Sequence, residues 1–240
     1  VSNLNTYLEC PKKFYYKNLL RVPSAKTKSL CMGTAVHGAL QDFLKNQDKE
    51  FLLNRFEYHL KREILSKTDF KDALQKGRKV LEDYHDEYSS TFNRESLAEY
   101  NFKNQNVFLD DVPLTGQIDK IEILDRSKKI VNVVDYKTGN PDSKSTDLKK
   151  GGKYWRQLVF YKILCENSKE FPYKMLSAEI DFVERGRATN AFKKFKIQIT
   201  DEDLEIVKTE IKDVYGEIKN LSFLNFTEDR FCGECEWCLT

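Results

Sequence analysis

Apolar residues recur every three to four positions through the first part of the chain, as on one buried face of a helix. This spacing predicts helices over Ser2–Leu20, Gly33–Leu44, Phe51–Leu65 and Phe70–Tyr88. We expect Ser2 to cap the first helix. Pro11 should interrupt that helix, because proline lacks a backbone donor and clashes with the preceding turn. A polar loop is expected over residues 22–29.

The pattern changes near residue 97, where β-branched and aromatic residues form shorter runs. These runs predict strands over Tyr100–Phe108, Val112–Leu124, Lys129–Lys137, Ser177–Glu184 and Phe192–Ile199. A tight turn at Asp110–Asp111 should join the first two strands. Helices are predicted over Tyr154–Cys165, after a charged loop, and from a capping box at Thr200 and Asp203 to about Leu221.

This order of elements predicts an α/β protein with a mixed central sheet flanked by helices and a helical N-terminal insertion. We divide the chain into a helical part (residues 1–96), an α/β core (97–225) and a cysteine-rich tail (226–240), all within one domain. Because the chain begins with Val1 and not with Met, we expect it to be a fragment of a longer polypeptide.

Composition narrows the class of protein only slightly. The 240 residues are enough to bury one sizeable core. Charged residues make up 32%, but the formal net charge is only +2, so attraction to nucleic acid has to come from local basic clusters. No apolar run approaches the ~18 residues of a membrane span, and no secretory leader is visible. We therefore expect a cytoplasmic protein without a membrane partner.

Two acidic residues lie near the ends of neighbouring predicted strands. Asp119 closes the run Gly116–Asp119, and Asp135 is followed by Tyr136 and Lys137. Adjacent antiparallel strands bring facing side chains to about 4.5–5.5 Å, and residues two apart share a face of their strand. Carboxylates bind Mg²⁺ or Mn²⁺, which activates water and offsets phosphate charge, and a nearby lysine stabilises the developing charge. On spacing alone, solvated strand-end acids with a surface lysine fit equally well.

Six motifs, in this order, resemble the RecB/AddB-like branch of the PD-(D/E)xK nuclease superfamily, found in helicase–nucleases and CRISPR-associated exonucleases. They are the opening residues 2–14, Gly33–His37, Gly116–Asp119, Val134–Gly139, Gln157–Tyr161 and the final cysteines. The resemblance covers essentially the whole chain. It implies a restriction-endonuclease-like core with an inserted helical part.

The resemblance also implies roles for single residues. It makes His37, Asp119 and Asp135 metal ligands, with the carbonyl of Tyr136, and it makes Lys137 the catalytic lysine. It places Gln157 and Tyr161 along the site, which agrees with their separation by four residues on one helix face. Without the resemblance, His37 would be taken as a packing or surface residue. His59 and His85 match no motif and are expected to be such residues.

The cysteines suggest a second metal centre. Cys232, Cys235 and Cys238 have the C-x₂-C-x₂-C spacing of cluster ligands, which favours ligation in a reducing compartment over disulfides. The resemblance implies that Cys10 is the fourth ligand of a [4Fe–4S] cluster. Zinc is the alternative, because four cysteines also form structural zinc sites. A ligand beyond residue 240, with Cys232 uninvolved, is left open. Cys31 and Cys165 are expected to be core residues.

These observations together predict a metal-dependent DNA nuclease, and we expect an exonuclease. The expected substrate is single-stranded DNA or DNA ends, and the resemblance implies a helicase domain or subunit as partner in DNA recombination and repair. Basic residues in and after the charged loop, Lys144, Lys149, Lys150, Lys153 and Arg156, are expected to contact the DNA backbone. The alternative is a non-catalytic DNA-binding module stabilised by an iron–sulfur cluster or zinc. The presence of Asp119, Asp135 and Lys137 argues against it.

Overall fold

The computed structural model describes residues 1–93, 95–224 and 232–239. Five strands form the main sheet in the order β1-β4-β5-β6-β7. They are β1 (Leu97–Asn101), β4 (Gln117–Asp125), β5 (Ile130–Lys137), β6 (Lys174–Phe182) and β7 (Lys194–Ile197). Only β5 and β6 pair in parallel; the other neighbours are antiparallel. β2 (Val107–Leu109) and β3 (Val112–Leu114) form a separate hairpin. The mixed α/β fold is confirmed.

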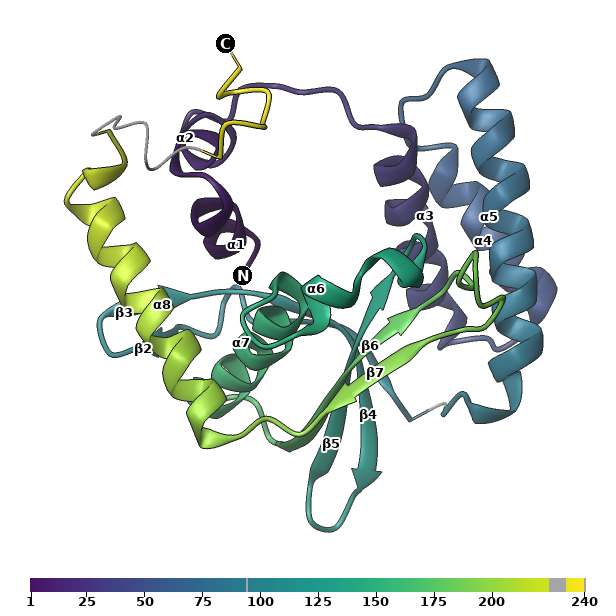
Figure 1. Ribbon diagram of the computed structural model, residues 1–240. Helices are drawn as coiled ribbons and strands as arrows, with labels where there is room; N and C mark the ends of the chain where they lie inside the picture. The colour runs from purple at the N-terminus through teal and green to yellow at the C-terminus, as the bar shows by residue number, and fades with distance from the viewer. Residues whose placement is uncertain (94, 225–231, 240) are drawn as a thin grey trace.

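Helices cover both faces of the sheet (Figure 1). The parallel pair requires a crossover, which contains α6 (Ser145–Leu148) and α7 (Lys153–Asn167). α7 packs on β5 and β6, and α8 (Asp201–Lys219) packs on α7. Successive strand residues point to opposite faces, so Val133 joins the core under α7 while Val134 joins the core under the N-terminal helices.

The N-terminal helices form two groups on different sides of the sheet (Figure 1). α1 (Ser2–Glu9), α2 (Pro11–Phe14) and the π-helical turn η1 (Tyr15–Leu19) lie beside α8. α3 (Lys28–Phe43), α4 (Lys49–Leu60) and α5 (Lys67–Tyr88) pack on one another at the other end. The break at Pro11 is confirmed: Cys10 is extended, and its Sγ accepts the Lys13 N–H at the start of α2.

Three helices begin earlier than predicted, because polar capping residues precede their first apolar residue. α3 begins at Lys28, where Thr27 accepts the Leu30 N–H; the segment was predicted to be loop up to residue 29. Asp48 and Ser66 cap α4 and α5 in the same way. Such caps satisfy free N–H groups of the first turn. Ser2, in contrast, is the first residue of α1 and not its cap.

Two predicted strands are each divided in two. The first becomes β1 and β2, separated by a turn after Phe102, and the second becomes β3 and β4, separated at Thr115 and Gly116. A Cβ on Gly116 would lie 2.6 Å from the Leu164 side chain of α7. The glycine at this break therefore allows the backbone between β3 and β4 to lie close to α7. The turn at Asp110 and the capping box of α8 are confirmed. The predicted charged loop contains α6.

Among the described residues, no helix combines the length and the apolar character that crossing a bilayer requires. Of the predicted tail, residues 226–231 and 240 lie outside the described residues.

Candidate active site

Three carboxylates lie in one row across β1, β4 and β5. The β4–β5 register pairs Lys120 with Val134, so the next position of the ladder sets Asp119 opposite Asp135. On the other side of β4, Glu99 lies opposite Asp119, between two paired positions. Facing residues of antiparallel strands project to the same side of the sheet. The predicted approach of Asp119 and Asp135 is thus explained by register, and Glu99 extends the row.

Asp119 is held by backbone and by α3. Its Oδ2 accepts the Tyr136 N–H at 2.8 Å and lies 3.3 Å from His37 Nδ1. α3 approaches this end of β5 closely, because a Cβ on Gly33 would lie 3.0 Å from Thr138 Oγ1. The glycine therefore lets α3 bring His37, one helical turn later, to the row of Glu99, Asp119 and Asp135, which we call the acid row.

The side chains of His37, Glu99 and Asp119 form a group suited to a divalent ion. One ligand atom from each lies within 4.8 Å of the others. Imidazole nitrogen and carboxylate oxygen are donors that Mn²⁺ accepts, and carboxylates are the usual side-chain ligands of Mg²⁺. Asp135 stands outside this group of three, but it lines a cavity together with His37 and Asp119.

Asp135 is held by α7 and by Lys137. Its Oδ1 accepts hydrogen bonds from Tyr161 Oη at 2.6 Å and from Gln157 Nε2 at 2.7 Å. Its Oδ2 lies 2.5 Å from Lys137 Nζ, with which it forms an ion pair. Lys137 Nζ also donates to Gln157 Oε1 at 2.9 Å. The motif on α7 and the motif on β5 thus form one polar network.

Burial and neighbouring charges shift the pKa values of these groups. Burial lowers the pKa of Lys137, but Asp135 outweighs it, so the pKa is raised and the ammonium stays charged. Burial raises the pKa of Asp135, with Lys137 opposing. Burial lowers the pKa of His37, but Asp119 outweighs it and the pKa is raised. Burial, followed by the charge of Asp119, raises the pKa of Glu99 to about 7.

Two cavities meet at the acid row. The larger, of about 610 Å³, is the β1-side cavity and is lined by Glu99, His59 and residues of α3. The smaller, of about 390 Å³, is the α7-side cavity and is lined by Asp135 and its network. His37, Gln117 and Asp119 line both. The acids are therefore lined by cavities on two sides.

The sequence did not single out Glu99. Glu99 lies one residue before the predicted strand Tyr100–Phe108 and carries no motif spacing, whereas the observed strand β1 begins at Leu97 and contains it. The available signal was register: once β1 pairs with β4, the position opposite Asp119 is fixed. Glu99 also has φ 51°, an unusual backbone conformation for a residue with a Cβ.

The structure corrects the expectation for Arg156. Its side chain is buried and makes two hydrogen bonds to Glu210 of α8, at 2.6 and 3.1 Å, and one to Asn5 of α1. It joins three helices and is not available to DNA. Lys150 lies 2.8 Å from Glu202, and Lys153 lies 3.4 Å from Asp147.

Other predicted packing residues lie where expected. Cys31 and Cys165 are buried. His59 Nε2 pairs with Asp42 at 2.8 Å, and the His85 ring packs edge-on against Phe43.

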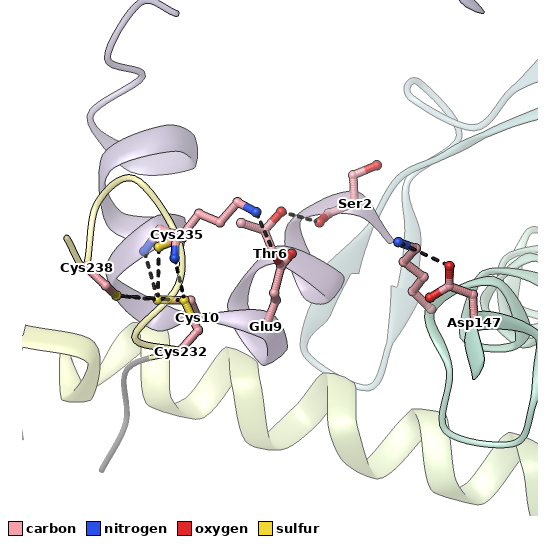
Figure 2. A network of polar contacts seen from close by, with 10 residues as sticks. Ser2, Thr6, Glu9, Cys10, Asp147, Cys232, Cys235 and Cys238 are labelled. Atoms are coloured by element: carbon pink, nitrogen blue, oxygen red, sulfur yellow. Dashed lines mark hydrogen bonds and ion pairs between the residues drawn. The ribbon is translucent and has the colours of Figure 1, made fainter. Parts of the chain in front are cut away.

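The four cysteines predicted to share a metal lie together. Figure 2 shows Cys10, between α1 and α2, facing Cys232, Cys235 and Cys238 of the tail. Cys10 Sγ lies 3.5 Å from Cys238 Sγ and 3.9 Å from Cys235 Sγ, and Cys232 Sγ lies 3.9 Å from Cys238 Sγ. No disulfide is formed by these cysteines. The four thiols fit a Cys₄ metal site.

The chain was compared with solved structures, with curated proteins and with protein-family models, and one solved structure supports the fold. A solved structure of a candidate exonuclease from Eubacterium rectale matches with a TM-score of 0.55 at 15% identity, over 99% of this chain and 85% of that one. The solved structure of SSO0001 matches with a TM-score of 0.40 at 14% identity, over 95% and 91% of the two chains. No curated protein matches. The family model of the PD-(D/E)XK nuclease superfamily matches residues 1–238. The chain therefore belongs to the PD-(D/E)XK nuclease superfamily.

Proposed function

We propose that this chain is a Mg²⁺- or Mn²⁺-dependent deoxyribonuclease that acts on single-stranded DNA or DNA ends. The observation that carries the proposal is the α7-side cavity, where Asp119, Asp135 and Lys137 converge with His37. Carboxylates, an imidazole and a buried ammonium are the side chains that metal-assisted phosphodiester hydrolysis needs.

In this proposal, His37, Asp119, Asp135 and the Tyr136 carbonyl hold the divalent ion. The ion supplies water activation and offsets charge on the phosphate. Lys137 keeps its positive charge beside the acids and stabilises the charge that develops on the phosphate oxygens. Its ammonium also lies 5.0 Å from the centre of the Tyr154 ring. Gln157 and Tyr161 orient Asp135 through hydrogen bonds.

We further propose that Cys10, Cys232, Cys235 and Cys238 hold a [4Fe–4S] cluster, as the family resemblance implies, with zinc as the alternative. The sulfur distances of 3.5–3.9 Å favour the zinc alternative, since four Zn–S bonds of about 2.3 Å give sulfur separations near 3.8 Å. Four irons would hold these sulfurs farther apart. Metal analysis after anaerobic purification, together with visible absorbance and brown colour, distinguishes the two.

We also propose that the chain belongs to the RecB/AddB-like branch and works with a helicase in DNA recombination and repair. The division of the chain at residues 96 and 225 is a proposal as well. The net charge of +2 supports this proposal. Because the chain has no large excess of positive charge to attract DNA, a larger assembly would deliver the DNA to it.

The test is cleavage of end-labelled single- and double-stranded DNA in Mn²⁺, Mg²⁺ or EDTA. The parent, Lys137→Ala and the exposed control Lys128→Ala are compared. We expect metal-dependent cleavage by the parent and the control, and a loss of at least a hundredfold in Lys137→Ala. Equal cleavage by the parent and the two variants would mean that the active site lies elsewhere. Binding of DNA without cleavage in either metal would favour the non-catalytic module.

A further inference from the structure

The turn between β6 and β7, residues 183–193, projects from the same edge of the sheet as the active site. β5 and β6 run parallel, with Lys137 paired to Phe182, and the Val183 N–H donates to the Lys137 carbonyl at 3.0 Å. The β4–β5 turn lies at the opposite edge (Figure 1). DNA bound at Lys137 would therefore lie near the β6–β7 turn and far from the β4–β5 turn.

This turn is rich in positive charge. Arg185, Arg187 and Lys193 are cationic, and Glu184 is its one acid. Arg185 and Lys193 form ion pairs with acids elsewhere in the chain, at 3.0 and 2.6 Å. Arg187 is exposed, and its guanidinium has neither an ion-pair nor a hydrogen-bond partner among the described residues. Arg187 is thus the cation of this turn that is available to bind an anion.

The backbone of Arg187 is held by the loop that follows β5. Asn140 Oδ1 accepts the Arg187 N–H at 3.1 Å, and Asp142 Oδ2 accepts the Ala188 N–H at 2.8 Å. The Lys193 ammonium, followed by the Ala188 N–H, lowers the pKa of Asp142 to about 2, so this carboxylate stays charged at neutral pH. The exposed arginine therefore stands on a fixed backbone.

The turn approaches this loop closely at Gly186. A Cβ there would overlap the side chains of Thr189 and Asp142, so the contact requires glycine. Asn140 follows Lys137 by three residues, which places their Cα atoms at most roughly 10 Å apart. A guanidinium can donate two parallel hydrogen bonds to a phosphate. Arg187 is therefore placed to reach a phosphate that flanks the one at Lys137.

We propose that Arg187 binds a backbone phosphate of the DNA strand a few nucleotides from the scissile phosphate, and that Asn140 positions it. This inference rests on the proposed function and adds a substrate contact outside the active site described above. Phosphate contacts fix the register of a strand and carry no sequence information, so Arg187 should strengthen the binding of any sequence.

The test measures binding of labelled single-stranded DNA of mixed sequence by fluorescence anisotropy, in Ca²⁺ and over a range of salt concentrations. We expect Arg187→Ala to bind at least about fivefold more weakly at low salt, and the slope of log Kd against log salt to fall by about 0.7. Arg187→Lys keeps the charge and should retain most of the slope. Arg126→Ala, an exposed arginine in the β4–β5 turn, is the matched control and should bind like the parent.

Two further measurements separate this contact from a structural effect. Asn140→Ala changes no charge; it should weaken binding in the parent and have no further effect in Arg187→Ala, because the two residues act through one contact. With saturating DNA in Mn²⁺, Arg187→Ala should cleave within about twofold of the parent rate, since the contact lies away from the reacting phosphate.

Equal affinity and equal salt dependence in Arg187→Ala and the parent, with cleavage intact, would overturn the inference and leave the proposed nuclease standing. Equal weakening by Arg126→Ala would also overturn it, because the effect would then be one of overall charge. A parent that neither binds nor cleaves DNA would overturn the proposed function, and the inference with it. Circular dichroism checks that each variant is folded, and Arg187→Gln replaces Arg187→Ala if the alanine variant is not.

Discussion

At the scale of single residues, the Asp135 carboxylate shows how a buried charge is stabilised. Removing a carboxylate from water is costly unless donors replace the solvent. Here Tyr161, Gln157 and Lys137 provide two hydrogen bonds and one ion pair. The same contacts fix the position of the carboxylate beside Asp119. The interactions that stabilise the buried charge are therefore also those that orient it.

If Asp135 binds the metal as proposed, Tyr161→Phe should lower turnover about tenfold and leave DNA affinity unchanged, since partners that orient a metal ligand contribute about 10–100-fold. Loss of the hydroxyl that bonds Asp135 Oδ1 should also lower the free energy of unfolding by about 1–2 kcal/mol. Single-turnover kinetics, DNA binding in Ca²⁺ and urea unfolding measure the three effects. Tyr100→Phe, on β1 and away from Asp135, is the control; an equal loss there would contradict the assignment.

A second prediction concerns Glu99 in metal-free protein. Its pKa is raised from the usual 4.5 to about 7, so the folded state holds a proton that the unfolded state has released. In EDTA, the free energy of unfolding should therefore fall as the pH rises from about 4.5 to about 7. The expected change is on the order of 1 kcal/mol, because water screens the partly exposed carboxylate.

Urea unfolding at several pH values measures this dependence. Glu99→Gln should be less dependent on pH than the parent over the same window, because the amide does not titrate. A parallel pH dependence in the variant and the parent would show that other groups are responsible.

Most of the proposed site residues could be found from the sequence because they carry motif spacing. Asp135 and Lys137 share a strand face, and Gln157 and Tyr161 share a helix face. Glu99 could not be found in this way, since its relation to Asp119 depends on the pairing of two strands whose boundaries were misplaced. Local spacing identifies residues of one element, and register is needed for the rest.

At the scale of elements, the helical group α3–α5 depends on close packing between α4 and α5. Gly77 of α5 lies directly against the Phe56 ring of α4, and a Cβ there would overlap the ring. We expect Gly77→Ala to destabilise the protein by about 1–3 kcal/mol, despite the better helix propensity of alanine.

Gly216→Ala in α8 is the matched control, because nothing lies within 4 Å of a Cβ at that position. Only the helix propensity of the residue changes at this position, so the substitution should raise the free energy of unfolding by about 0.5–1 kcal/mol. Thermal and urea unfolding of both variants measure the difference. Stabilisation by both substitutions would mean that α4 and α5 adjust freely and that the packing is loose.

The elements were easier to predict than their ends. Helices and strands were correctly identified wherever apolar periodicity was strong. Starts were missed where Thr27, Asp48 and Ser66 cap helices ahead of the first apolar residue. Arg156 was misassigned because its partner Glu210 lies 54 residues away, on a helix whose position the sequence pattern does not give.

At the scale of the whole molecule, the Cys₄ group joins segments that lie far apart in the chain. Cys10 and Cys238 are 228 residues apart. We expect Cys235→Ser to lose the bound metal and to lower the free energy of unfolding. The chain-entropy estimate for closing such a long loop is on the order of 5 kcal/mol, which is the upper limit. Elemental analysis and urea unfolding measure both effects.

Cys31→Ala is the control, because Cys31 is buried in α3 and takes no part in the group. This variant should keep its full metal content. Metal retained at the parent level in Cys235→Ser would contradict the assignment of these four cysteines.

The cysteine group also affects how the fold bears mechanical load. If the chain acts on DNA as proposed, tension on a bound strand would pass into the segments that carry the site residues. With a metal bound, the start of the chain and the tail beside α2 form a closed loop (Figure 1). Metal–sulfur bonds then take up force that would otherwise peel α1 and α2 from α8. Binding of a metal at the four cysteines is therefore expected to raise the rupture force of the domain.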